Sequence, residues 1–124
     1  MDNTISLNEN RQFRRVYQKG KSFVNSLLVI YFLKNGSNRN RLGIAVNKKV
    51  GKAVVRNRVR RLVKESYRLK EKEIKKGYDI VFVSRVRARE SSYDAVHKAM
   101  HHLLKRAGLL NNSAFGVGSS EKRS

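Results

Sequence analysis

The side chains best suited to bind another molecule gather between Lys48 and Arg68, in the stretch KKVGKAVVRNRVRRLVKESYR, whose one acid is Glu65. Surface helices usually mix both signs of charge, because like charges on one face repel each other. A polyanion would relieve that repulsion. The candidate binding residues are Lys48, Lys49, Lys52, Arg56, Asn57, Arg58, Arg60, Arg61, Lys64 and Arg68.

Arginine chemistry favours phosphate as the group bound. The planar guanidinium holds two phosphate oxygens at once, which the lysine ammonium cannot do. Arg56, Arg60 and Arg61, with the amide of Asn57, would form a compact donor surface on one helix face. The plain alternative is a solvated charged face, which the lack of acids disfavours. Composition alone does not separate RNA from DNA.

Aromatic residues could add base stacking to this charge. Phe13 and Tyr17 are one helical turn apart, and Tyr31 falls in an apolar segment expected nearby. Aromatic rings beside a basic surface can stack unpaired bases. On the residues alone, the commoner role of such a pair in the hydrophobic core is favoured.

Neither a metal site nor a catalytic group is expected. His97, His101 and His102 lie close to Asp94, but the chain has no cysteine and no HExxH pattern, so zinc is disfavoured. The nine acids form no cluster that could hold catalytic metal ions. The sequence therefore predicts a binding protein that does not itself cut its ligand.

Composition bounds the class of protein. The net charge is +20 over 124 residues, which concerns partners and not fold. The longest apolar run, residues 27–33, has the length of a strand, and no signal peptide is recognisable, so no membrane association is expected. With no cysteine, we expect a cytoplasmic protein.

Hydrophobic periodicity predicts an α+β fold with a single sheet of about four strands and helices packed on it, in the order α-β-β-β-α-β-α. A first helix over 7–19 would begin at a Ser6–Glu9 capping box and end at Gly20. Extended segments are expected at 22–24, 27–33, 41–47 and 78–84, with helices at 53–69 and from Ser91 or Ser92 to 107. Residues 70–76 would be a fraying end or linker. Residues 1–110 would form one RNA-binding domain, and 111–124 a disordered tail.

Side-chain alternation predicts which faces are buried. In the segment 41–47, Leu42, Ile44 and Val46 should face a core, while Gly43 and Ala45 leave the other face open. The basic helix should bury one stripe: Val55, Val59, Leu62, Val63, Ser66 and Leu69. The last helix should bury Val96, Met100, Leu103 and Leu104.

The stretch from Gly43 to Leu62 (GIAVNKKVGKAVVRNRVRRL) resembles the bacterial ribonuclease P protein family, whose central element is Arg-Asn-Arg followed by a hydrophobic and two basic residues. FRRVYQKG from Phe13 to Gly20 is similar to the family's first helix. The segments 28–33 and 80–85 are similar to two of its strands. The resemblance covers about residues 5–107.

The resemblance implies a subunit that binds the catalytic ribonuclease P RNA and the 5′ leader of precursor tRNA, with no obligate protein partner. The RNA would carry out the hydrolysis and hold the Mg²⁺, and the protein would bind no cofactor. The arginine-rich helix would face that RNA. Phe13, Tyr17, Tyr31 and Arg85 would line a leader-binding cleft, and a left-handed βαβ crossover would join the last two strands, against the usual rule.

Three other readings stay open. One is an RNA-binding protein of the ribosomal type, with no catalytic RNA partner. Another is a DNA-binding protein that places the basic helix in a major groove, but no helix-turn-helix glycine or dimer interface is recognisable. The third, an independent nuclease, is disfavoured by the shortage of acids.

Electrostatic binding should respond steeply to salt. If about six to ten phosphates are contacted, affinity for RNA should fall about 10³–10⁵-fold from 50 to 200 mM salt, because each contact releases bound counterions. Filter binding of the purified protein over that range measures the slope. A flat response would count against the electrostatic account.

Overall fold

A computed structural model describes residues 4–111. Five strands and three α-helices follow one another along the chain: β1 (Thr4–Ser6), α1 (Asn10–Lys19), β2 (Lys21–Val24), β3 (Leu28–Lys34), β4 (Asn40–Val46), α2 (Ala53–Lys70), β5 (Tyr78–Ser84) and α3 (Tyr93–Arg106). Short 3₁₀ turns occupy Lys48–Val50 (η1), Glu71–Glu73 (η2) and Val86–Glu90 (η3). The predicted α+β class is confirmed, with five strands in place of about four.

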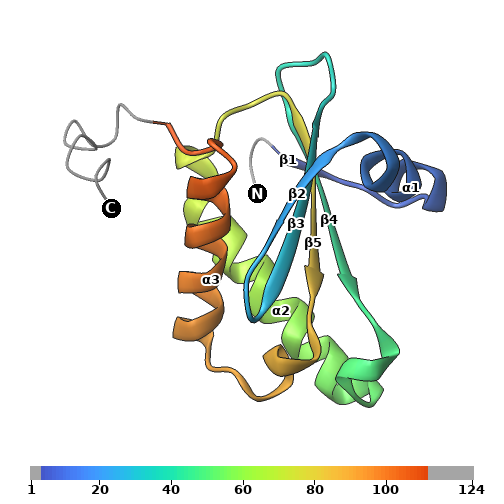
Figure 1. Cartoon of the computed structure of the whole chain (residues 1–124), viewed down its shortest axis with the longest axis vertical. Coiled ribbons are helices and arrows are strands. Elements are labelled where there is room, and N and C mark those ends of the chain that lie inside the picture. The colour runs from blue at the N-terminus through green and yellow to red at the C-terminus, as the bar shows by residue number, and fades with distance from the viewer. Residues whose placement is uncertain (1–3, 112–124) are drawn as a thin grey trace.

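The strands form one mixed sheet in the order β1-β4-β5-β3-β2. Helix α2 connects β4 to β5, and these two strands are parallel neighbours in the sheet, so β4-α2-β5 is a βαβ unit. β1 pairs in parallel with β4, whereas β3 pairs antiparallel with both β5 and β2. Figure 1 shows α2 and α3 together on one face of this sheet and α1 alone on the other.

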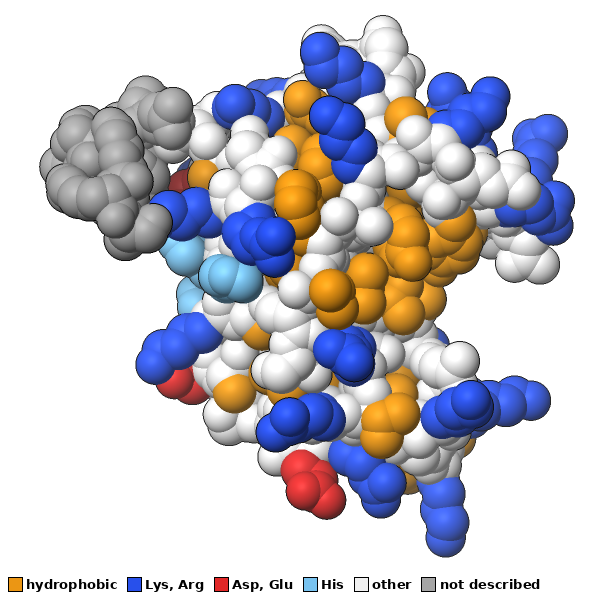
Figure 2. Space-filling view, viewed as in Figure 1, with side chains coloured by type: hydrophobic (Ala, Val, Ile, Leu, Met, Phe, Trp, Pro, Cys, Tyr) orange, Lys and Arg blue, Asp and Glu red, His pale blue; other side chains and the backbone are white. Residues whose placement is uncertain are grey.

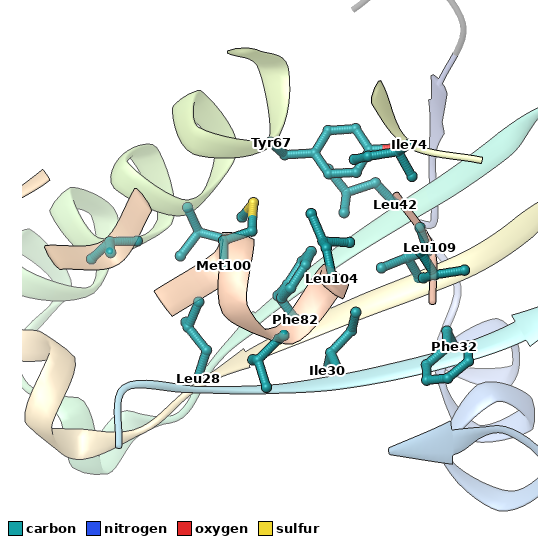
Figure 3. Packing of buried hydrophobic residues seen from close by; sticks show 14 of the residues in the cluster. Leu28, Ile30, Phe32, Leu42, Tyr67, Ile74, Phe82, Met100, Leu104 and Leu109 are labelled. Carbon is teal, nitrogen blue, oxygen red and sulfur yellow. The ribbon is translucent and has the colours of Figure 1, made fainter. Parts of the chain in front are cut away.

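The main core lies between the sheet and the pair α2 and α3 (Figure 3). Leu28 and Ile30 of β3 and Phe82 of β5 meet Met100 and Leu104 of α3 there, all fully buried. A smaller cluster of Leu7, Val16 and Val81 lies under α1. Because α1 is only ten residues long, most of the burial that stabilises the fold takes place on the other face.

The start of the first helix was predicted wrongly. Residues 4–6 form β1, with Ser6 opposite Leu42, and the backbone N–H of Leu7 donates to the carbonyl of Leu42 at 2.9 Å. Burial of Leu7 against Val16 outweighs the local capping signal at Ser6. The helix begins three residues later, where the Gln12 side-chain oxygen accepts from the backbone N–H of Glu9 at 3.0 Å.

Gly20 ends α1 as predicted, but for another reason than a left-handed turn. Its φ is −84°, which any residue adopts. A Cβ at this position would lie 2.6 Å from the backbone oxygens of Phe32 and Val16. Glycine is therefore required by the close approach of the helix end to β3.

The burial stripes of α2 and α3 are mostly as predicted. Val96, Met100, Leu103 and Leu104 are fully buried in α3, which begins at an Ser92 N-cap. In α2, Val59, Val63 and Ser66 are buried, but Leu69 is 52% exposed and Tyr67 takes its place in the core. The prediction for Leu69 was wrong because the buried stripe is centred farther round the helix, with Tyr67 and Lys70 as its last positions, and Leu69 lies outside it.

The connection after α2 is more ordered than a fraying linker. The predicted linker buries Lys70 and Ile74, and Ile74 forms an isolated β-bridge with Leu110. The backbone N–H of Asn111 donates to the Glu73 carbonyl at 2.8 Å. The rest of the predicted disordered tail, residues 112–124, lies outside the described residues. No helix in the described part of the chain is long and apolar enough to cross a bilayer.

Asp79, at the start of β5, ties several elements together. Its carboxylate is buried and accepts two hydrogen bonds from the Arg41 guanidinium in β4, both at 2.7 Å. The side-chain amide of Asn35 donates to it at 3.0 Å. Arg15 of α1 approaches at 3.9 Å. One acid thus links β4, β5, the β3–β4 turn and α1.

Histidine and lysine meet where α2 packs against α3. Lys70 Nζ, in a side chain only 6% exposed, lies 3.0 Å from Nδ1 of His101. Burial, with the Lys70 charge adding to it, lowers the pKa of His101 below its ordinary value; His97 and Lys105 act in the same sense and Glu73 opposes them. His101 is therefore neutral in the folded protein near pH 7, and its Nδ1 accepts a hydrogen bond from Lys70 Nζ.

This contact predicts a stability loss in mild acid. The unfolded chain takes up a proton on His101 near pH 6.5, while the folded chain resists it, so the free energy of unfolding should fall as the pH drops below that value. His101→Gln keeps an acceptor for Lys70 and cannot be protonated. The melting temperature of the variant should fall less between about pH 7.5 and 5.5 than that of the wild type. Parallel curves would contradict the assignment.

Candidate nucleic-acid interface

The outer face of α2 carries the basic residues that the sequence singled out. Asn57, Arg58, Arg61, Lys64 and Arg68 are exposed, and Arg56 and Arg60 are half-buried. Lys48 and Lys49 of η1 and the N-cap residue Lys52 are exposed just before the helix. The core stripe centred on Val59 and Val63 turns this face outward.

Several of these side chains also hold the protein together. Arg56 Nε donates to the Gly51 carbonyl at 3.1 Å. One nitrogen of Arg58 donates to the Ser91 carbonyl at 2.8 Å, which ties α2 to the segment after η3. Arg68 forms an ion pair with Glu65. Within the described residues, the exposed Arg61 and Lys64 form no ion pair, and neither do Lys48, Lys49 and Lys52, so these cations are available to a partner.

The three aromatic residues named from the sequence come together. The ring centroids of Tyr17 and Tyr31 are 4.8 Å apart, edge to face, and those of Phe13 and Tyr17 are 6.3 Å apart. Tyr17 is 38% exposed, while Phe13 and Tyr31 are half-buried against the small cluster under α1. Burial, and then the neighbouring Tyr31, raise the pKa of Tyr17, so its hydroxyl remains a donor at neutral pH. The trio is part core and part open surface.

A shallow groove of about 420 Å³ runs beside these rings. Asn10, Phe13, Arg14 and Tyr17 form its wall on α1, and Ile44 and Ala45 line it from β4. Gly43 allows this arrangement, because a Cβ there would lie 2.6 Å from the Phe13 ring. The face around Gly43 is therefore covered by Phe13, where the sequence predicted it open. Figure 2 shows apolar side chains gathered below α1 with Lys and Arg around them.

A second, smaller groove of about 190 Å³ lies over the edge of β4. Arg60 and Lys64 of α2 line it together with Ile44, which also lines the aromatic groove. β1 ends at Ser6, opposite Leu42, while β4 continues to Val46. The arginine face of α2 and the aromatic groove thus meet along the same uncovered edge of the sheet.

Arg85 does not join the aromatic trio. One of its guanidinium nitrogens donates to the Asn25 carbonyl at 2.8 Å. Tyr31 pairs with Val81, four residues before Arg85, a separation of about 13 Å along a strand. Arg85 lies at the far end of the sheet from the rings, near η3.

The acidic side chains do not suit a magnesium site. Four of them are already paired with a cation: Glu9 with Arg11, Glu65 with Arg68, Asp79 with Arg41 and Asp94 with Lys98. Within residues 4–111, no group of three histidine or carboxylate side chains is placed to hold a metal ion. The donor set is one for binding anions.

Asn10 and Arg14 were missed in the sequence analysis. They line the aromatic groove and repeat with Phe13 and Tyr17 at i, i+3, i+4 and i+7, the spacing of one helix face. The spacing was readable from the sequence. The apolar periodicity that predicts this helix face selects Phe13 and Tyr17 and gives no signal for the polar Asn10 and Arg14.

Comparison with known proteins gives one consistent result. The family model described as Ribonuclease P matches residues 1–108. The chain is 52% identical over 106 residues to the ribonuclease P protein component of Clostridium botulinum, covering 85% of this chain and 96% of that protein. The structure is similar to a Staphylococcus aureus RNase P protein, with a TM-score of 0.80, 33% identity, and coverage of 86% and 97%. It is also similar to a Staphylococcus aureus RNase P protein mutant described as having defective mRNA degradation activity, with a TM-score of 0.79, 32% identity, and coverage of 85% and 89%.

The contact between Phe13 and Gly43 can be tested by a double-mutant cycle. Gly43→Ala should lower the free energy of unfolding by about 1–3 kcal/mol, because the added methyl displaces the Phe13 ring. In a Phe13→Leu background the same change should cost less, since a smaller, flexible side chain can move aside. Urea denaturation of the four proteins measures the coupling. Strictly additive costs would show that Phe13 does not cover Gly43.

Proposed function

The chain belongs to the ribonuclease P protein family, whose members are subunits of an endoribonuclease holoenzyme. From this premise we propose which ligand the outer face of α2 binds and which ligand the aromatic groove binds. The outer face of α2 binds the catalytic RNA, and the aromatic groove binds the 5′ leader of precursor tRNA. The observation that carries the proposal is their meeting at Ile44, which lines both grooves.

The RNA-facing surface is supported by charge and exposure. From Arg56 to Arg68 the helix extends about 18 Å, and its only acid in that stretch is Glu65. Arginine forks at several turns can follow consecutive phosphates of a folded RNA. Lys48, Lys49 and Lys52 extend the same positive surface past the N-terminus of α2. Arg58 contributes mainly by holding η3 against the helix.

The leader site is supported by the aromatic groove. Tyr17 has the exposure that stacking needs, and its ring contacts those of Tyr31, edge to face, and Phe13. Stacking of a base on an aromatic ring contributes about 1–3 kcal/mol and tolerates any sequence. A leader whose sequence varies between precursors fits such a surface. Arg85, at the end of the sheet, would meet the leader only if the strand continues along the open face.

The protein supplies position and charge to the reaction, and the RNA supplies the chemistry. Mg²⁺, when bound by the RNA, stabilises the charge that develops on the phosphodiester. Four carboxylates of the described residues are already paired with cations of the same chain, and no group of three described histidine or carboxylate side chains is placed to hold that ion. Positive side chains near the RNA–substrate junction would instead reduce phosphate repulsion, which strengthens the holoenzyme's hold on substrate and ion.

A reconstitution experiment tests the proposal. Precursor tRNA is incubated at low magnesium with the protein, with the cognate ribonuclease P RNA, and with both. Cleavage to a mature 5′ end is expected only from the pair. Cleavage of precursor tRNA, or of an mRNA, by the protein alone would refute the assignment of chemistry to the RNA. Binding without any effect on cleavage would favour a ribosomal-type RNA-binding protein.

Paired arginine variants locate the RNA-binding face. Arg60→Ala with Arg61→Ala should weaken binding of the catalytic RNA about tenfold or more, because two charge-assisted contacts are lost. Lys75→Ala with Lys76→Ala removes the same charge from exposed positions before β5 and should have a much smaller effect. Circular dichroism should give unchanged melting curves for both. Equal losses of binding would mean that overall charge, and not the α2 face, holds the RNA.

A further inference from the structure

The three arginines of α1 differ in what surrounds them. Arg11 Nε lies 2.6 Å from the Glu9 carboxylate, and Arg15 approaches the buried Asp79 at 3.9 Å. Arg14 is exposed, lines the aromatic groove and forms no ion pair with any described residue. Of these three cations, Arg14 alone is left for a ligand in the groove.

The place of Arg14 on the helix sets its relation to the rings. Asn10, Phe13, Arg14 and Tyr17 share one helix face and form a single wall of the groove. Arg14 follows Phe13 and comes three residues before Tyr17, so its side chain leaves the helix beside the two rings, on the same wall of the groove. Asn10 stands one turn before Arg14 with an amide that can donate a hydrogen bond.

An aromatic ring and a guanidinium side by side match the two parts of a nucleotide. A ring takes the base by stacking, and the fork takes two oxygens of the adjoining phosphate. The groove is shallow and apolar at its floor, where Ile44 and Ala45 of β4 face the rings. An unpaired strand can lie in it, whereas the width of a duplex would keep bases away from the wall.

We propose that Arg14, assisted by Asn10, binds the phosphate of a leader nucleotide whose base stacks on Tyr17. This inference rests on the proposed leader site and adds a residue that sets the path of the strand through it. Arg14 is a positioning residue: it fixes the backbone of the leader without reading its sequence. It takes no part in breaking the phosphodiester bond.

The charge-matched variants Arg14→Gln and Arg11→Gln test this in the reconstituted holoenzyme. Arg14→Gln should weaken binding of precursor tRNA about 5–10-fold at fixed salt. It should also make the negative slope of log affinity against log salt shallower by about 0.7, the value of one single-strand phosphate contact. Arg11→Gln, whose arginine is paired with Glu9, should stay within about twofold of wild type. Mature tRNA, which has no leader, should bind all three holoenzymes equally.

A third variant separates phosphate binding from a structural effect. Arg14→Lys keeps the charge, so it should restore the salt slope that Arg14→Gln loses. The inference is overturned if Arg14→Gln and Arg11→Gln weaken binding equally, if mature tRNA is affected as much as precursor, or if Arg14→Lys keeps the reduced slope. Failure of the proposed function itself looks different: the wild-type holoenzyme would then not distinguish precursor from mature tRNA.

Discussion

The buried carboxylate of Asp79 is the constraint on which the functional surface depends. In a protein of net charge +20, the one acid buried in the described part of the chain binds Arg41 through both oxygens. The carboxylate is buried while the Arg41 side chain is partly exposed, so loss of Arg41 would leave a buried charge without its main partner, which is destabilising. Because Arg41 and Asp79 are opposite each other in the β4–β5 register, the pair fixes that register. The approach of Arg15 to the same carboxylate sets α1 above these strands.

Unequal cover on the two faces of the sheet then creates the binding surface. α2 and α3 cover one face and bury nearly all of the large apolar side chains. α1 covers only part of the other face, leaving the ring of Tyr17 in a groove beside Ile44 and Ala45 of β4. Burial of apolar side chains on the face covered by α2 and α3 stabilises the fold. The face under α1 can therefore leave aromatic side chains partly exposed. The basic side of α2 reaches this exposed face only at the edge of β4, through Ile44.

The sequence was enough for the strongly periodic elements. β5 follows from its continuous run of β-branched and aromatic residues, and the buried stripe of α3 follows from a 3.6-residue repeat. β1 could not be found this way, since three residues carry no period and their strand exists only because Leu42 and its neighbours offer a partner. The capping pattern at Ser6 was a correct local signal overruled by that distant pairing and by burial of Leu7.

The candidate site was predicted in part for the same reason. Local spacing placed Phe13 beside Tyr17, with Tyr31 in a segment expected nearby, and the resemblance added Arg85. Only the pairing of β3 with β5 shows Arg85 to be remote from the rings. The meeting of His101 with Lys70 joins residues 31 positions apart and has no local signature. The covering of Gly43 by Phe13 likewise depends on where α1 crosses the sheet. Tertiary placement, and not residue type, decides these details.

The strand order has a consequence for how the chain assembles during synthesis. Of the described strands, β5 is the last to leave the ribosome, yet it occupies the centre of the sheet, between β4 and β3. Until it inserts, two inner strands each present a bare edge, and the earlier segments have no complete surface on which to close. In a nascent chain that lacks β5, the pair β1 and β4 and the pair β3 and β2 have no strand to join them into one sheet. The sheet can therefore be completed only after β5 has been synthesised, because its central position depends on that strand.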